Sequence, residues 1–410
     1  MGHIADGIPD LKDPDLYVEE VPHAVFARLR RDAPVHWNPE ADGAGFWAVT
    51  RYNDVVAVLG KPDIFSSARE NGGHRIFNEN EVGLTNSGEA AIGTPFISQD
   101  PPINSLYRRA LMPSLTPNRL EDIEARINAR VADLLARVPN DQAVDIVPLL
   151  SAPLPLLTLA ELLGLPGDMW QQLYHWTNAF VGEDDPDFRQ SPAALAATMG
   201  EFLAFGRELF AQRRSNPGKD IASLLANARV GDEPVSEADF IGNLILVLVG
   251  GNETTRNSLS HSIAAFAAFP DEWQRLRADP GLMKTAVREM VRYATPVMHM
   301  RRTAMMETAI GGQRIAKGDK VVTWFAAANR DEAEFSDPDR FDITRTNIRH
   351  LGFGTGQHSC VGFRLAEMQL RVAFEHLLKR VKAFEVVSKP KRFRSNFING
   401  LKDLNVVLLS

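Results

Sequence analysis

The segment from Phe353 to Gly362 combines a cysteine with several glycines at a spacing that suits a metal or cofactor site. Cys360 is the only cysteine of the 410-residue chain. The glycines permit a tight, non-helical loop whose backbone can approach a flat group closely. Cys360 falls where the next helix is expected to begin, and a helix N-terminus favours a thiolate.

Considered without its neighbours, Cys360 allows three interpretations. It is an inert buried thiol, the commonest state of a lone cysteine, or a metal-ligating thiolate, or a nucleophile with a histidine base. His358 is near in sequence, but residues two apart do not face each other on a helix, so no base can be assigned.

A second constellation, Gly250-Gly251-Asn252-Glu253-Thr254-Thr255, interrupts a long apolar run. Glycine in a buried helix costs about 1 kcal/mol relative to alanine, so we expect a compensating role. One interpretation is close packing of two helices. The other is a groove for a small ligand above a flat cofactor. Thr254 then either bonds back to its own helix or, together with Glu253, relays protons to a bound ligand.

The hydrophobic periodicity predicts a mainly α-helical chain with a minor β part. Helices are expected at 54–59, from about 104, and at 120–138, 147–164, 168–181, 192–214, 219–227, 236–269, 283–293 and 360–380. The β-rich regions are about 35–50, 308–325 and 384–409. No Pro/Gly/Ser-rich linker divides the chain, so we expect one domain over 1–410.

Composition excludes several classes of protein. The formal net charge of −7 argues against nucleic acid as a partner. One cysteine cannot form an internal disulfide, which fits a reducing compartment. The first residues lack the features of a signal peptide, and no apolar run approaches the roughly 20 residues of a membrane span. We therefore expect a cytoplasmic protein without a membrane anchor.

The cysteine segment resembles the haem-binding signature of the cytochrome P-450 family, Phe-x-x-Gly-x-x-x-Cys-x-Gly. Phe353, Gly356, Cys360 and Gly362 match it in register. The resemblance implies that Cys360 ligates the iron of haem b, that Phe353 packs beside the sulfur, and that His358 reaches a haem propionate.

Residues 250–255 are similar to the oxygen-activation motif of the same family. Glu253 and Thr254 would be its acid–alcohol pair, with Gly250 beside the haem. Glu289 and Arg292 match the Glu-x-x-Arg pair of the family, which is structural. From spacing alone, that pair would be read as a surface ion pair of small energetic value.

Two arginines are implied as propionate partners. Arg302 precedes Thr303-Ala304, and Arg108 ends a segment that resembles Asp-Pro-Pro-x-His-x-x-x-Arg. Asn104 stands where the family usually has histidine. Asparagine can donate a hydrogen bond but cannot carry charge, so the resemblance supports a propionate contact for Arg108 more strongly than for Asn104.

The implied fold is a triangular helical prism with haem between the long central helix and the cysteine-loop helix. The implied substrate pocket is mainly apolar, which predicts a hydrophobic substrate. It is formed by the loop 67–97 and by Leu246, Val249, Gly250, Val297, Met298, Phe397 and Ile398.

The implied activity is insertion of one oxygen atom from O2 into a C–H bond by a monomeric monooxygenase. Electrons would come from NAD(P)H through a ferredoxin reductase and a [2Fe–2S] ferredoxin, docking on Arg109, Arg345, Arg349 and Arg364. The segments 251–258 and 395–400 look like bacterial groups that act on alkanes, fatty acids, terpenoids or steroid side chains. A cysteine-dependent hydrolase and a haem sensor without turnover are the alternatives.

Overall fold

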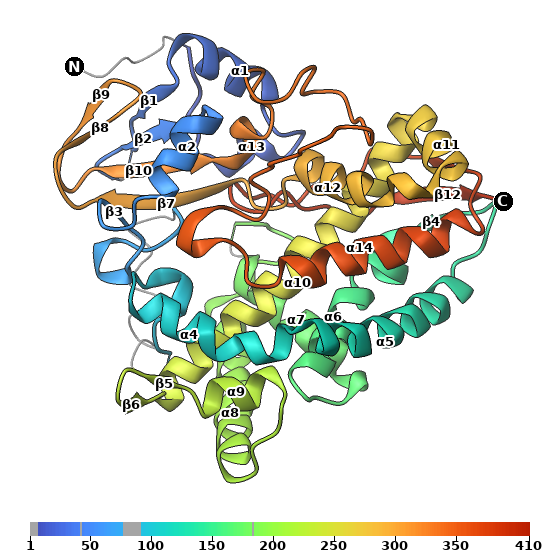
Figure 1. Cartoon of the computed structure of the whole chain (residues 1–410), viewed down its shortest axis with the longest axis horizontal. Helices are drawn as coiled ribbons and strands as arrows, with labels where there is room; N and C mark the ends of the chain where they lie inside the picture. The colour runs from blue at the N-terminus through green and yellow to red at the C-terminus, as the bar shows by residue number, and fades with distance from the viewer. Residues whose placement is uncertain (1–6, 42, 77–91, 183) are drawn as a thin grey trace.

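The computed structural model describes all residues except 1–6, 42, 77–91 and 183. Helices fill most of the molecule, and the largest sheet lies at one corner (Figure 1). This agrees with the predicted mainly α architecture. No helix among the described residues is long and apolar enough to cross a bilayer.

The described residues form α-helices along the whole length of the chain. They are α1 His23–Asp32, α2 Tyr52–Leu59, α4 Ile103–Leu111, α5 Pro117–Ala136, α6 Pro153–Leu162, α7 Trp170–Val181, α8 Pro192–Ser215, α9 Ile221–Ala226, α10 Glu237–Ala268, α11 Pro270–Ala278, α12 Met283–Ala294, α13 Phe325–Ala328 and α14 Phe363–Leu378. Short 3-10 turns and one π-helical turn, Val147–Ser151, connect them.

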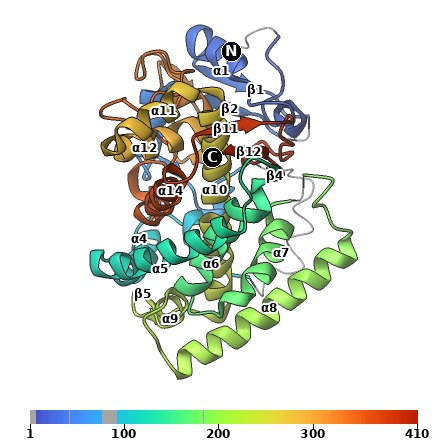
Figure 2. The ribbon, with the colours of Figure 1, turned by 90° about the vertical axis from the view of Figure 1, so that its right-hand side faces the viewer.

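Helix α10 is the axis of the fold. It has 32 residues, which gives a length of about 48 Å. It begins as predicted after Ser236, whose side chain accepts a hydrogen bond from the Asp239 amide. It packs against α6, α7, α8, α12 and α14 and runs through the middle of the molecule (Figures 1 and 2).

The corner sheet has five strands in the order β1-β2-β10-β7-β3. These are β1 Val35–Asn38, β2 Phe46–Val49, β10 Lys320–Trp324, β7 His299–Ala304 and β3 Phe65–Ser66. β2 and β10 pair in parallel, and the other neighbours are antiparallel. β1 and β2 form an antiparallel hairpin, which confirms the predicted β-rich region 35–50. Strand β7 of this sheet carries Arg302.

Smaller sheets complete the β part. One joins β11 Ala383–Val386, β12 Asn405–Leu409 and β4 Ala143–Asp145, and two hairpins join β5 Arg229–Val230 to β6 Glu233–Pro234 and β8 Thr308–Ile310 to β9 Gln313–Ile315. β8, β9 and β10 all lie within the predicted β-rich region 308–325, which is confirmed.

Some elements differ from the sequence predictions. α1 and α11 were not predicted, and α14 begins at Phe363, three residues after Cys360. The cysteine therefore lies in the loop before the helix rather than in its first turn. The predicted pocket loop 67–97 is described only at its ends, because 77–91 lies outside the described residues.

Candidate functional site

A large cavity lies between the middle of α10 and the cysteine loop. It brings together side chains from α4, α10, β7 and the segment 352–370. Predicted residues that line it are Cys360, Phe353, His358, Arg108, Arg302, Gly250, Thr254, Leu246 and Val297. No aspartate or glutamate lines it among the described residues. The cavity is thus apolar, with cationic groups that lack acidic partners inside it.

The cysteine loop holds its residue by backbone geometry. The Cys360 amide donates to the Phe353 carbonyl at 2.8 Å. Gly356 has φ of 68°, and a Cβ atom there would lie 2.4 Å from the Leu59 carbonyl oxygen of α2. Only glycine fits this close approach of two backbones. The cysteine loop therefore packs closely against the end of α2, and Cys360 faces the cavity.

The thiol of Cys360 is exposed, and it is exposed to the cavity that it lines. Protein surrounds its other sides, and this burial raises the pKa of Cys360, whereas the Gly362 amide and Arg108 lower it. The sequence predicted that a helix N-terminus would favour a thiolate. The later start of α14 leaves burial as the larger effect, so in the protein alone the thiol form is favoured.

Two arginines reach the cavity from different elements. Arg302 is buried, and its guanidinium donates to the neighbouring Arg301 carbonyl at 2.7 Å. Burial lowers its pKa to about 10. Arg108 of α4 donates no hydrogen bond to a protein group and meets no carboxylate in the described part of the chain. Two cations facing an apolar cavity call for an anionic occupant.

His358 lies in a network with Asn104. The Asn104 side-chain amide donates to the Phe96 carbonyl at 2.7 Å and faces His358 Nδ1 at 3.3 Å. His358 Nε2 lies 3.1 Å from the Ser67 hydroxyl. Burial, followed by Arg302, lowers the pKa of His358 to about 3. Asn104 therefore contacts the histidine of the cysteine loop and is fully buried.

The glycines of α10 open a groove. A Cβ atom at Gly250 would meet nothing within 4 Å, whereas one at Gly251 would lie 3.2 Å from Leu159 of α6. Gly251 therefore allows close packing of α10 against α6, one of the two interpretations, whereas Gly250 leaves open space beside the cavity that it lines. The Thr254 hydroxyl donates to the Gly250 carbonyl at 2.7 Å, as mid-helix threonines commonly do.

Glu253 points to a different side of α10 from Thr254. Its carboxylate is buried and accepts from Arg256 Nη2 at 2.5 Å and from the Asn252 amide at 3.0 Å. The Asn252 amide also donates to the Thr177 hydroxyl of α7 at 3.0 Å. Burial raises the pKa of Glu253, and Arg256 opposes that shift. Arg256 was missed by the sequence reasoning, although an acid and a base three residues apart on a helix are a known signal.

The Glu289–Arg292 pair is fully buried, unlike the surface pair that spacing alone indicated. Its two Arg–carboxylate hydrogen bonds are both 2.7 Å. Arg345 joins the pair at 3.3 Å from Glu289 and donates to three carbonyls, with 9% of its side chain exposed. Arg345 is therefore not available for docking, which corrects its place in the predicted patch. Arg109, Arg349 and Arg364 are exposed.

The cavity lining differs from the predicted substrate pocket at four positions. Val297 lines it, but Met298 is buried in a separate cluster near Trp324, because neighbouring residues of an extended segment point to opposite sides. Val249 does not line the cavity, whereas Leu246 and Val247 do. Phe397 and Ile398 lie behind it: Phe397 contacts His74 and His299, and Ile398 bridges Val297.

Comparisons with known proteins show the family of this chain. The cytochrome P450 family profile matches residues 159–403. Linalool 8-monooxygenase of Pseudomonas putida is 66% identical over 98% of this chain and 99% of that protein. Methyl-branched lipid omega-hydroxylase of Mycobacterium tuberculosis is 35% identical, covering 95% of this chain and 91% of its own.

A solved structure gives the same picture. A Mycobacterium marinum cytochrome P450 in complex with pseudoionone matches with a TM-score of 0.88 and 32% identity over 99% of both chains. The fold is that of cytochrome P450 structures. The chain belongs to the cytochrome P450 family and is a P450 monooxygenase.

The residues present fit the haem that this family implies. The cavity carries one thiol, two arginines and no carboxylate in its described lining, which suits a flat group with an iron centre and two propionates. Side chains at Gly250 or Gly362 would project into open space. Both glycines therefore leave room for a planar occupant between α10 and the cysteine loop.

Proposed function

We propose that this monooxygenase hydroxylates linalool or a closely related acyclic terpenoid, with haem b as its cofactor. The observation that carries the catalytic part of the proposal is that Cys360 and Thr254 line one apolar cavity from opposite elements. The 66% identity to a linalool 8-monooxygenase supports the terpenoid part. Fatty acids, alkanes and steroid side chains are the competing substrates.

Each site residue has a distinct proposed role. Cys360 would hold the haem iron with Phe353 packed beside the sulfur, and Arg108 and Arg302 would hold the two propionates. Because Asn104 donates to His358, we assign Asn104 a positioning role for that histidine. When bound, haem supplies the oxygen chemistry that hydroxylates an unactivated C–H bond.

Proton delivery is the task of α10. Thr254 holds its hydroxyl proton on the Gly250 carbonyl and must turn toward the cavity to pass a proton on. Glu253 is held by Arg256, so its carboxylate must leave this partner to resupply Thr254. Glu289 and Arg292 would only support the cysteine loop.

The substrate would lie on the apolar part of the lining. Leu246 and Val247 of α10 face Val297 and Met300 across the cavity. Such side chains select hydrophobic carbon skeletons, and the hydroxyls of Thr255 and Ser258 lie farther along the same helix face. A small alcohol with an apolar chain suits this distribution.

Spectral titration tests the substrate. Linalool, dodecanoic acid and a cholesterol-derived ketone are added separately to the oxidised, haem-loaded enzyme, and the change in the haem spectrum gives each dissociation constant. We expect linalool to bind most tightly. Leu246→Ala should weaken linalool at least fivefold, and Val249→Ala, which does not line the cavity, serves as the matched control. Tighter binding of either competitor would reassign the substrate class.

The electron donor is proposed to be a [2Fe–2S] ferredoxin reduced by an NAD(P)H-dependent reductase, in the cytoplasm. Arg109 and Arg364 are exposed, and each is close in sequence to an exposed apolar side chain, Met112 and Phe363 respectively. Exposed cationic and apolar side chains together suit an acidic partner protein. R109E/R364E should slow reduction by ferredoxin at least tenfold at low salt. R189E, in the segment between α7 and α8, is the control. Unchanged reduction by the double variant would remove this docking face.

A further inference from the structure

Two separate parts of the haem cavity wall are connected by a cluster of ring side chains that lies behind them. One part is formed by Phe96 and Ile97, in the short turn before α4. The other is formed by Val297 and Met300, before and within β7. The ring side chains behind the wall, which we call the ring cluster, are His74, His299 and Phe397. These three residues do not line the cavity themselves.

The rings of the cluster pack against one another. The centroid of the Phe397 ring lies 5.2 Å from that of His299 and 6.3 Å from that of His74, both in edge-on arrangements. The ring of Trp324, on β10, lies 4.9 Å from that of His299. Such arrangements of rings are favourable at these separations. The three rings come from segment 71–76, strand β7 and segment 395–399, so their packing joins three segments that are far apart in the sequence.

His299 adds hydrogen bonds to this packing. It is fully buried, and its Nδ1 lies 3.1 Å from the Asn396 carbonyl oxygen. A carbonyl oxygen can only accept, so Nδ1 carries the proton. Nε2 then accepts the hydrogen bond of the Ile76 amide at 3.4 Å. Burial lowers the pKa of His299 to about 3, so the ring is neutral and one imidazole holds both neighbouring segments to β7.

His74 connects the same cluster to the other part of the wall. Its Nδ1 and the Ser98 hydroxyl share a hydrogen bond at 2.6 Å. Ser98 ends the turn that presents Phe96 and Ile97 to the cavity. The backbone carbonyl of His74 accepts from the Arg301 amide of β7 at 2.7 Å. The position of the turn relative to β7 therefore depends on His74.

The geometry of β7 places the ring cluster directly behind the second part of the wall. Successive residues of a strand point to opposite faces, so Met300, which lines the cavity, leaves His299 on the far face. The Met298 amide donates to the Phe397 carbonyl at 2.8 Å, which holds the chain just after Val297. A shift of His299 or Phe397 is therefore passed to the cavity wall through the backbone.

We propose that the ring cluster sets the spacing between the two parts of the wall and thereby determines which substrates fit the haem cavity. His74 and His299 are positioning residues, because they act through the side chains that line the cavity. The proposal concerns the shape of the cavity and holds for any hydrophobic substrate of the enzyme. A merely stabilising role would change the free energy of unfolding but not the discrimination between ligands of different size.

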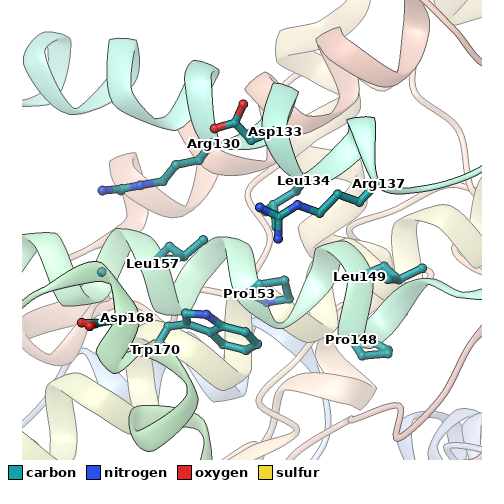
Figure 3. Close-up of a pocket in the computed structure, with 11 residues that line it drawn as sticks. Arg130, Asp133, Leu134, Arg137, Pro148, Leu149, Pro153, Leu157, Asp168 and Trp170 are labelled. Carbon is teal, nitrogen blue, oxygen red and sulfur yellow. The ribbon is translucent and has the colours of Figure 1, made fainter.

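A separate cleft provides a control for general loss of stability. It lies between α5, the π-helical turn and α6, where Leu149 and Leu157 line it together with Trp170 (Figure 3). Among the described residues it shares no lining residue with the haem cavity. Leu149→Ala should therefore loosen packing there without moving the cavity wall.

Two azoles of different size, imidazole and 4-phenylimidazole, probe the wall in the haem-loaded enzyme. Both bind haem iron, and the second adds a ring that the apolar lining must accommodate. The haem spectrum gives both dissociation constants. His74→Leu and His299→Leu should each weaken 4-phenylimidazole at least fivefold relative to imidazole, since an apolar pocket discriminates by size. Leu149→Ala should leave the ratio of the two constants unchanged.

Two further variants test the hydrogen bond between His74 and Ser98. Ser98→Ala should change the ratio as His74→Leu does, and the double variant should add nothing further. His74→Asn places an amide close to the position of Nδ1, so it should return the ratio to within twofold of the wild type. An altered ratio that persists in His74→Asn would overturn the role of this hydrogen bond.

An unchanged ratio in both leucine variants, each shown to be folded by far-UV circular dichroism, would overturn the proposal. An equal change of the ratio in Leu149→Ala would overturn it as well, because the ratio would then report on stability rather than on the cavity wall.

Discussion

The buried ion pair between Glu253 and Arg256 leads to a sharp prediction about stability. Both side chains are at most 2% exposed, and each has few other partners: Asn252 for Glu253, and a 3.4 Å contact with Asn178 for Arg256. Removing one member leaves the other charged and uncompensated, which costs about 3–5 kcal/mol. We therefore expect Glu253→Gln and Arg256→Met each to lower the free energy of unfolding by about that amount.

The double variant should be far less destabilised than the sum of the two. When both charges are absent, neither desolvation penalty remains, and exchange of buried pairs for uncharged residues is often near neutral. A coupling energy of about 3 kcal/mol is therefore expected from the double-mutant cycle. Urea unfolding of the haem-loaded enzyme, followed by far-UV circular dichroism, gives the four free energies.

An exposed pair provides the control for this cycle. Arg31 and Asp32 form an ion pair with 70% and 45% of their side chains exposed, so Arg31→Met should cost less than about 1 kcal/mol. Additive effects of Glu253→Gln and Arg256→Met would refute the reasoning, because they would mean that each residue is satisfied without the other. Proton delivery could then not depend on release of Glu253 from Arg256.

Three further perturbations have defined outcomes. Thr254→Ala should leave O2 and NAD(P)H consumption largely intact, while the amount of product formed per NAD(P)H falls roughly tenfold. An unchanged ratio of product to NAD(P)H would exclude proton delivery through Thr254. Gly242→Ala places a Cβ atom 2.2 Å from the Gly93 carbonyl oxygen and should lower the free energy of unfolding by about 1–3 kcal/mol. In the control Gly200→Ala, the added Cβ atom meets nothing within 4 Å, so the free energy of unfolding should be unchanged or raised by up to about 1 kcal/mol. Equal effects of the two variants would contradict the contact between Gly242 and Gly93. Burial lowers the pKa of His261 from 6.5 to about 3, so as the pH falls below 6.5 the unfolded chain binds the proton first and the folded state loses stability. His261→Gln should therefore reduce, by about 2 kcal/mol, the loss of unfolding free energy between pH 7 and pH 5, measured by urea unfolding. An unchanged pH dependence would show that this histidine is not buried in its neutral form.

The sequence predicted the elements that carry strong periodicity. The helix predicted at 236–269 corresponds to α10, and the β-rich region predicted at 35–50 contains β1 and β2. α1 and α11 are short and rich in charged residues, so their pattern gave no clear signal. Their place is fixed by packing: Phe26 of α1 contacts Trp324, and Trp273 of α11 contacts Phe266 and Phe374.

The candidate site was predictable in its residues but not in its orientations. Cys360, Arg108, Arg302 and Thr254 do meet at one cavity, as the motif spacing implied. Adjacent residues on a helix point about 100° apart, so the sequence order of Glu253 and Thr254 could not show that their side chains diverge. The burial of Arg345 was equally out of reach, because it depends on contacts with Glu289 and with the carbonyls of residues 336–340.

The central claim is that Cys360 gives the haem a thiolate ligand. The measurement that tests it most directly is the Soret band of the reduced, CO-bound protein. The account predicts the long-wavelength position that is typical of thiolate ligation, and its loss in Cys360→Ser. A band at the imidazole-type position, or a purified protein that retains no haem when supplied with it, would contradict the account.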